Sequence, residues 1–129
     1  MTDEELVVAF ESASLPAEQF THAAHVRVAW CYLRLAPLPE ALLRFSSALR
    51  RFATAHGAAG KYHETITVAY MLIIADRCTR GRAATWAEFA EENPDLFARP
   101  SVLEGCYSPE VLMSERARAS FVLPDAWRG

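Results

Sequence analysis

One stretch of this chain, residues 39–56, constrains the fold more than any other, because its apolar side chains repeat with the period of an α-helix. The apolar positions, which stand three or four residues apart and share one face, are Leu42, Phe45, Leu49 and Phe52. A stripe of this kind is stable only when it is buried against other helices. No segment shows the strict alternation of apolar and polar residues that is typical of a half-buried strand. We therefore expect an all-α fold.

Capping signals divide the rest of the chain into further helices. A Thr followed three residues later by Glu forms a capping box, and such boxes begin at Thr2 and Thr85. Ser108 followed by Pro109 is typical of the start of another helix. The expected helices cover residues 3–12, 21–36, 39–56, 62–79, 86–92 and 109–120. We expect one domain, residues 1–129, built as a compact antiparallel helical bundle with two or three short flanking helices, on which the apolar tail 121–124 packs.

The composition excludes several classes of partner. With 129 residues, of which 52% are hydrophobic, the chain is long enough to bury a core. Its net charge of -3 argues against nucleic acid, which attracts a basic surface. The longest apolar run, residues 68–75, is far shorter than the ~20 residues of a membrane-spanning helix. The acidic residues 2–5 are unlike a secretory signal, and the three cysteines show no CxxC spacing. We expect a cytoplasmic bacterial protein with reduced cysteines and with no nucleic-acid or membrane partner.

The short connections between helices bring distant polar residues to one end of the bundle. Residues 37–39 and 57–61 join the second, third and fourth helices. Such short loops make consecutive helices antiparallel neighbours, so the second and fourth helices begin at the same end. The polar residues carried by those two helix starts, which we call the His/Glu cluster, are His22, His25, His63 and Glu64.

The His/Glu cluster has the composition of a metal centre. His22 and His25 are three residues apart on one helix face, with about 5–6 Å between their Cβ atoms. The positive end of the helix dipole favours neutral imidazole, which is the form that a metal or a general base requires. Three imidazoles and a carboxylate suit Zn²⁺ with an open position, or a non-haem Fe or Mn site. We expect His22, His25 and His63 to be ligands, Glu64 to be a fourth ligand or the general base, and Tyr62 to assist catalysis.

Three further residues bear on this predicted centre. Tyr32 is an alternative to Tyr62 as a proton relay. Cys78 shares the helix face of His63 but lies ~22 Å farther along the helix, at 1.5 Å per residue, and cannot bind the same ion. His56 falls at the same end of the bundle, but the C-terminus of its helix favours the charged form of imidazole. The sequence leaves open whether His56 joins the site.

Three strings of residues resemble a known family. They are Phe-Thr-His-Ala-Ala-His at residues 20–25, Lys-Tyr-His-Glu-Thr-Ile-Thr at residues 61–67, and the region from Tyr-Ser-Pro to Phe-Val-Leu-Pro-Asp at residues 107–125. The chain resembles, over nearly its whole length, a family of small helical bacterial proteins of unknown function. The resemblance implies a shared helical fold, and it implies neither a substrate nor a metal.

Three functions agree with the sequence. The leading hypothesis is a small metal-dependent enzyme that acts on a small molecule through the His/Glu cluster. The second is a metal-free acid–base enzyme (an isomerase, cyclase or hydrolase) with a histidine of the cluster as base and Glu64 or Tyr62 as its partner. The third is a non-catalytic module in which the apolar helices and tail form a groove for a small ligand or a homodimer interface, with aromatic surface from Trp30, Trp86 and Trp127.

Overall fold

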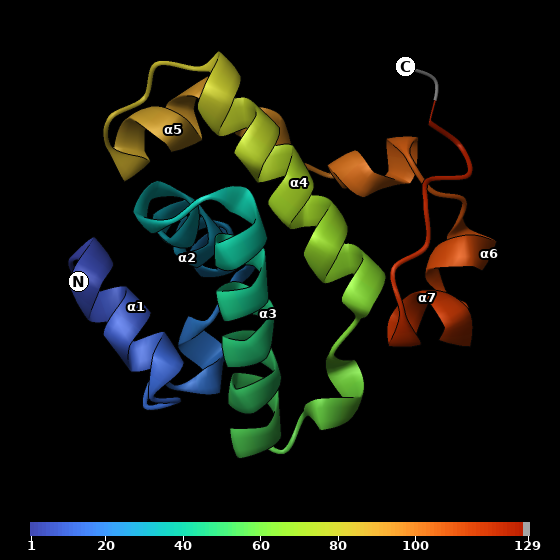
Figure 1. Cartoon of the computed structure of the whole chain (residues 1–129), viewed down its shortest axis with the longest axis horizontal. Helices are drawn as coiled ribbons and strands as arrows, with labels where there is room; N and C mark the ends of the chain where they lie inside the picture. Colours follow the sequence, from blue (N-terminus) through green and yellow to red (C-terminus); the bar gives the residue numbers. More distant parts are fainter. Residues whose placement is uncertain (128–129) are drawn as a thin grey trace.

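The computed structural model describes residues 1–127, and throughout this range every regular element is a helix (Figure 1). The α-helices are α1 (Asp3–Glu11), α2 (His22–Leu35), α3 (Leu38–Ala55), α4 (Glu64–Arg80), α5 (Trp86–Glu92), α6 (Pro109–Leu112) and α7 (Glu115–Ala119). Four 3-10 turns join them, namely η1 (Ala17–Gln19), η2 (Ala59–Lys61), η3 (Pro94–Leu96) and η4 (Val102–Gly105). The expected all-α fold is confirmed. Within the described range, none of the helices combines the length and the apolar character needed to cross a membrane.

Local signals set most of the helix boundaries. The Thr2 hydroxyl accepts a hydrogen bond from the Glu5 N–H, and the Glu5 carboxylate accepts one from the Thr2 N–H. Thr85 and Glu88 form the same reciprocal pair at the start of α5. After α3, Gly57 adopts a φ of 67°, the left-handed conformation that favours glycine at a helix end. These boundaries depend on neighbouring residues alone, which is why they agree with the boundaries predicted from the sequence.

The start of α4 differs from the expected one by two residues. The helix begins at Glu64, not at Tyr62, because His63 is its N-cap. The His63 backbone is extended, and its Nδ1 accepts a hydrogen bond from the Ile66 N–H at 3.1 Å. An imidazole thereby takes the place of the Ser, Thr or Asp side chain that usually caps a helix.

The last expected helix, over residues 109–120, is divided into α6 and α7. Met113 ends α6, and Ser114 has an extended backbone and caps α7. The Ser114 hydroxyl accepts from the Ala117 N–H at 3.1 Å and donates to the Val111 carbonyl at 2.7 Å. A serine side chain competes in this way with the backbone hydrogen bonds of a continuous helix.

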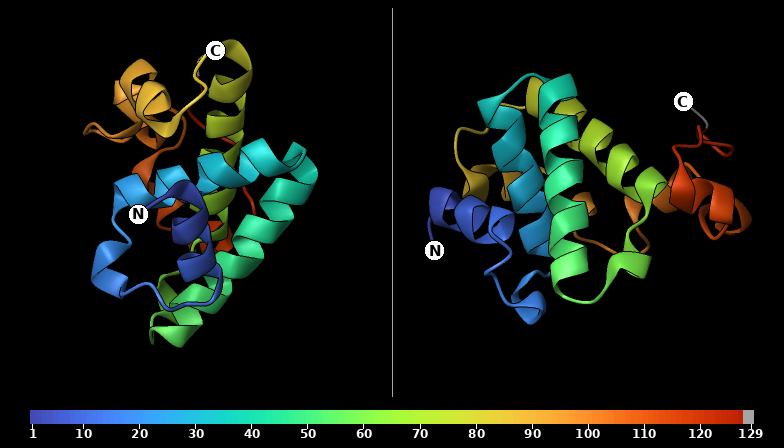
Figure 2. Two further views of the ribbon diagram at one scale, coloured as in Figure 1. Left: turned by 90° about the vertical axis from the view of Figure 1, so that its left-hand side faces the viewer. Right: turned by 60° about the horizontal axis from the view of Figure 1, so that its bottom comes forward.

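The first four helices share the main hydrophobic core. α2 packs on both α3 and α4, while α1 packs across α2 and α3 (Figure 2). Aromatic rings fill the centre of this core, where the ring centroid of Phe10 lies 5.1 Å from that of Phe20 and 5.8 Å from that of Phe45. Phe45 and Phe52 are both buried, so the apolar face of residues 39–56 is directed inward as expected.

α4 packs on the main core on one side and on the C-terminal segment, residues 93–127, on the other, and Leu96 of that segment also belongs to the main core. On one side its Ile74 belongs to the main core, and on the other its Ala69 packs with Leu103 and Tyr107. α4 also contacts α7, and it is inclined to α3 in the view of Figure 1. A helix covered on two sides requires apolar residues around most of its circumference.

Candidate functional site

His22, at the start of α2, contacts the C-terminal segment and the middle of α4. Its Nε2 lies 2.8 Å from the Leu96 carbonyl oxygen, and its ring meets the Tyr70 ring edge-on with centroids 5.5 Å apart. Tyr70 stands two turns after His63, which corresponds to ~10 Å along the helix axis. α2 therefore contacts α4 about two turns beyond His63, although the short loops predict that His22 and His63 lie together.

His25 lies among aromatic rings. Its ring centroid is 5.3 Å from that of Phe20 and 5.3 Å from that of Phe45. Burial, with a smaller contribution from the nearby His22, lowers the pKa of His25 to about 4. The imidazole is therefore neutral near pH 7, as the sequence predicts for a histidine at this position.

His63 uses both ring nitrogens for contacts with the protein itself. Nδ1 accepts from the Ile66 N–H, so in neutral imidazole the proton is on Nε2. Nε2 lies 2.7 Å from the Leu112 carbonyl oxygen, to which it donates. A metal ion at Nδ1 would displace the helix cap, and one at Nε2 would displace the bond to the C-terminal segment.

Glu64 and Tyr62 form a polar cluster with Arg50, a residue that the sequence does not indicate as part of a site. The Tyr62 hydroxyl donates to Glu64 Oε1 at 2.6 Å, and Arg50 Nη2 lies 3.1 Å from the same oxygen. The Arg50 guanidinium also lies over the Tyr62 ring, 4.4 Å from its centroid. Burial, together with the hydrogen bond to Glu64, raises the pKa of Tyr62 to about 12. Arg50 shares no motif with its partners, so only the packing of α3 beside α4 reveals it.

The described part of the chain does not gather the side chains of a metal centre. Among residues 1–127, no group of three or more His, Cys, Asp or Glu is arranged so that it could hold a metal ion. The ring of His56 packs on Phe52, with centroids 4.4 Å apart. Tyr32 is completely buried in the main core. The Zn, Fe or Mn site over His22, His25 and His63 therefore stays a prediction without support from this geometry.

The polar residues of the three strings instead attach the C-terminal segment to the helical core. Thr65, which is completely buried, donates from its hydroxyl to the Ser120 carbonyl at 2.8 Å and accepts from the Val122 N–H at 3.0 Å. The Tyr107 hydroxyl donates to the Val122 carbonyl at 2.6 Å. The bond from His22 on α2 to Leu96 and the bond from His63 to Leu112 attach the segment at two further points, whereas the bond between Tyr107 and Val122 lies within the segment.

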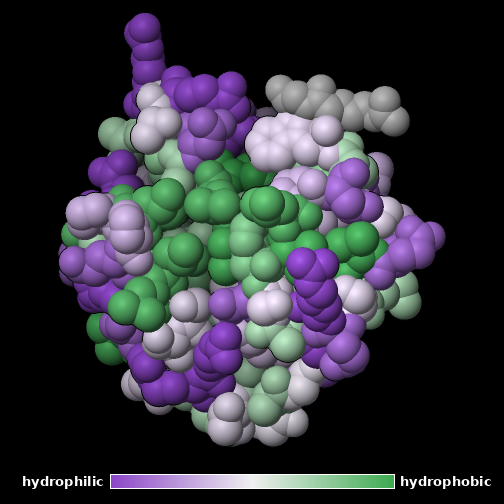
Figure 3. Space-filling view, turned by 45° about the vertical axis from the view of Figure 1, so that its right-hand side comes forward, coloured by the Kyte–Doolittle hydropathy of each residue, from purple (hydrophilic) through white to green (hydrophobic). Residues whose placement is uncertain are grey.

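An apolar groove with a volume of about 530 Å³ lies between α4 and the C-terminal segment. Hydrophobic surface gathers on this face of the molecule (Figure 3). The main apolar side chains of this groove, which we call the α4 groove, are Leu72, Ile73, Leu103, Phe121, Leu123 and Trp127. Ion pairs lie at its edge, where Arg80 meets Asp76 at 2.8 Å and Arg77 meets Asp95 at 2.6 Å.

The three tryptophans have different surroundings. Trp30 is buried and packs against the half-buried Trp86, with ring centroids 5.9 Å apart, so these two rings belong to the core. Trp127 is 64% exposed and lines the α4 groove. Of the three tryptophans, Trp127 is therefore the one that is exposed on the α4 groove.

Comparisons of the chain with protein-family models, with curated proteins and with solved structures find no match. The family resemblance of the three strings therefore stays an expectation.

Proposed function

We propose that this protein binds an apolar small molecule in the α4 groove. The observation that carries the proposal is a set of large apolar side chains that remain exposed although the backbone beside them is firmly attached. Val122 is buried and its N–H and carbonyl are both hydrogen-bonded, while the neighbouring Leu123 is 74% exposed. Trp127 and Leu72 are exposed on the same groove, by 64% and 40%.

The size and lining of the α4 groove suit a ligand. Small-molecule sites commonly enclose about 300–1,000 Å³ and have mostly apolar walls with a few polar groups. The volume of about 530 Å³ falls in this range, and the Arg80–Asp76 pair places polar groups at one edge. Contiguous exposed apolar surface is uncommon on monomeric proteins and marks sites of binding.

The hydrogen bonds of the C-terminal segment support the same proposal. Thr65 and Tyr107 hold residues 120–122 by their backbone atoms, so the backbone that carries the adjacent apolar side chains is held in place. A backbone that is held before binding does not have to be ordered when a ligand arrives, which favours affinity. Binding of an apolar molecule would remove Leu123 and Trp127 from water, with a gain of roughly 25 cal/mol for each Å² of apolar surface.

A titration of ¹⁵N-labelled protein with n-octanol, followed by two-dimensional NMR, tests the proposal. We expect saturable shifts of amides near Ile73, Leu103 and Leu123 and of the Trp127 indole N–H. Leu123→Asp should weaken binding at least tenfold, because it places a charge in the apolar wall. Met113→Asp is the matched control, since Met113 is 83% exposed and lies outside the groove. Shifts spread over the whole surface, or equal weakening by both variants, would contradict the proposal.

A second candidate is a metal-free acid–base function in which Glu64 is the base and Tyr62 its partner, whereas the sequence predicts a histidine of the His/Glu cluster as the base. The contact of 2.6 Å between the Tyr62 hydroxyl and Glu64 Oε1 favours it, because it sets a proton donor beside a carboxylate that is 25% exposed. A screen of ester, amide and isomerisation substrates would test this function. We expect turnover that is lost in Glu64→Gln and kept in Glu40→Gln, a control at an exposed carboxylate of α3. Turnover that survives in both variants would exclude Glu64 as the base.

A further inference from the structure

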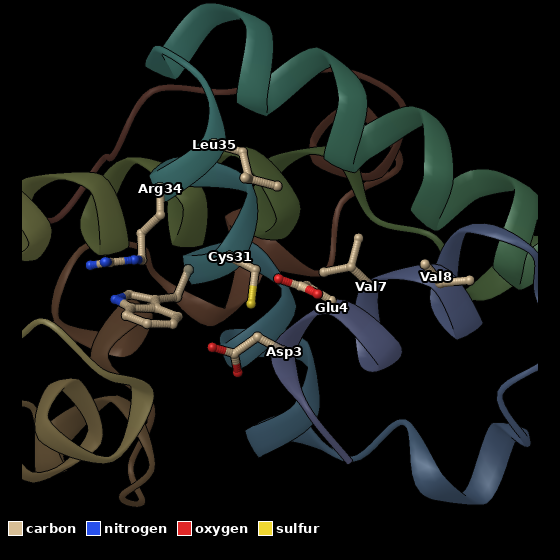
Figure 4. Close-up of a pocket in the computed structure, with 8 residues that line it drawn as sticks. Asp3, Glu4, Val7, Val8, Cys31, Arg34 and Leu35 are labelled. Carbon is tan, nitrogen blue, oxygen red and sulfur yellow. The ribbon is translucent and has the colours of Figure 1, made fainter.

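A second groove, with a volume of about 340 Å³, lies between α1 and α2 (Figure 4). Val7 and Cys31 are buried at its base, and Val8 and Leu35 are exposed along it, by 64% and 67%. This depression, which we call the α1 groove, shares no lining residue with the α4 groove. An inference drawn from it is therefore independent of the proposed function.

A guanidinium without an anionic partner stands on one side of the α1 groove. The Arg34 guanidinium, labelled in Figure 4, lies over the Trp30 indole at 4.7 Å from the ring centroid. Within residues 1–127, Arg34 forms no ion pair, although five other arginines do. Stacking on an indole restricts the guanidinium and leaves its N–H donors directed to the outside, where they suit a carboxylate.

Two carboxylates stand on the α1 side of the same groove. Figure 4 shows Asp3 and Glu4 beside Cys31, facing the side from which Arg34 approaches. Asp3 is already paired with Arg27 at 2.7 Å. Glu4 is exposed and forms no ion pair within the described residues. The groove therefore has one unpaired charge of each sign on opposite sides of an apolar base.

We infer that the α1 groove binds a small apolar zwitterion whose ammonium and carboxylate are separated, as in a dipeptide of leucine. The carboxylate would meet Arg34, the ammonium would meet Glu4, and the apolar side chains would cover Val7, Val8 and Leu35. Charge complementarity supports this occupant, because an anion alone would leave Glu4 unpaired beside it and a cation alone would leave Arg34 unpaired. The apolar base supports side chains of the leucine type.

Isothermal titration with leucyl-leucine and two blocked forms tests the inference. N-acetyl-leucyl-leucine lacks the ammonium, and leucyl-leucine amide lacks the carboxylate. We expect each blocked form to bind about tenfold more weakly, which corresponds to one charge-assisted hydrogen bond. Free leucine should also bind more weakly, because it has one apolar side chain instead of two to cover the base of the groove.

Two variants test which residue binds each end of the ligand. In Arg34→Gln, leucyl-leucine and its amide should bind equally, and in Glu4→Gln, leucyl-leucine and its acetyl form should bind equally. Arg116→Gln, at an exposed arginine of α7, should leave all the affinities unchanged. No binding of leucyl-leucine at millimolar concentration, equal binding of the three forms, or an equal loss in Arg116→Gln would each overturn the inference. Because none of these residues lines the α4 groove, either result leaves the octanol test of that groove unaffected.

Discussion

Replacing Thr65 by valine removes the central link between α4 and the C-terminal segment with almost no change of shape. Thr65 is completely buried, and its hydroxyl makes one hydrogen bond to the Ser120 carbonyl and one from the Val122 N–H. In the variant the buried Val122 N–H has no partner, which costs about 1–3 kcal/mol. The Ser120 carbonyl belongs to an exposed residue, so water replaces that bond at little cost. We expect the free energy of unfolding to fall by about 2 kcal/mol.

Urea denaturation followed by far-ultraviolet circular dichroism measures this loss. For a chain of 129 residues it corresponds to a decrease of the melting temperature by roughly 6–10 °C. Thr79→Val is the matched control, because Thr79 lies on the same helix but is exposed and donates only to the Asp76 carbonyl within α4. Its free energy of unfolding should change by no more than about 0.5 kcal/mol. A loss of less than about 0.5 kcal/mol in Thr65→Val, or an equal loss in the two variants, would refute the role of Thr65 as an anchor.

Three further predictions concern His25, Cys31 and Tyr62. Because burial lowers the pKa of His25 to about 4, from an ordinary value near 6.5, the unfolded chain binds more protons between these two pH values. The contribution of His25 to the free energy of unfolding should therefore be fully present above about pH 6.5 and fall by up to about 3 kcal/mol as the pH approaches 4. Urea titrations at several pH values should show that His25→Phe removes most of this pH dependence. Burial raises the pKa of Cys31 to about 11, so its thiol should react with iodoacetamide at pH 7.5 only in urea, and rapid labelling of the native protein would contradict this. Tyr62→Phe should cost no more than about 1.5 kcal/mol in denaturation, since one hydrogen bond to Glu64 is lost, and a greater loss would show a further role.

The features that the sequence predicted correctly depend on neighbouring residues. The capping boxes at Thr2 and Thr85 and the glycine at position 57 act within one turn, so the local sequence contains everything that determines them. The break between α6 and α7 is also a local event at Ser114. It was missed because a serine in a helical pattern is compatible both with a continuous helix and with a new cap.

The arrangement of the candidate site depends on the relative inclination of the helices, which the sequence does not state. Short loops predicted correctly that α2, α3 and α4 are neighbours, as their contacts show. Loop length does not determine where α2 meets α4, and His22 contacts Tyr70 two turns beyond His63. His22 and His63 bond to the backbone carbonyls of Leu96 and Leu112, which are distant in the sequence. Because every residue has a backbone carbonyl, the amino-acid types at positions 96 and 112 do not reveal these contacts.

The α4 groove could be predicted only in part. The expectation that residues 121–124 pack on the bundle holds for Val122, which is buried, while Leu123 is 74% exposed. Alternation between a buried and an exposed position is a property of the extended backbone, held by Thr65 and Tyr107. The hydropathy of four consecutive apolar residues does not distinguish the side chains that fill the core from those that line a groove.

Intermolecular nuclear Overhauser effects between bound n-octanol and the protein test the central claim most directly. If n-octanol binds in the α4 groove, we expect cross-peaks from the alkyl chain to the methyl groups of Leu72, Ile73 and Leu123 and to the indole ring of Trp127. Cross-peaks to exposed apolar side chains on other faces, such as Leu43 on α3 or Met113 after α6, would contradict it. So would an alkyl chain that gives no cross-peaks to the residues of the α4 groove at saturation.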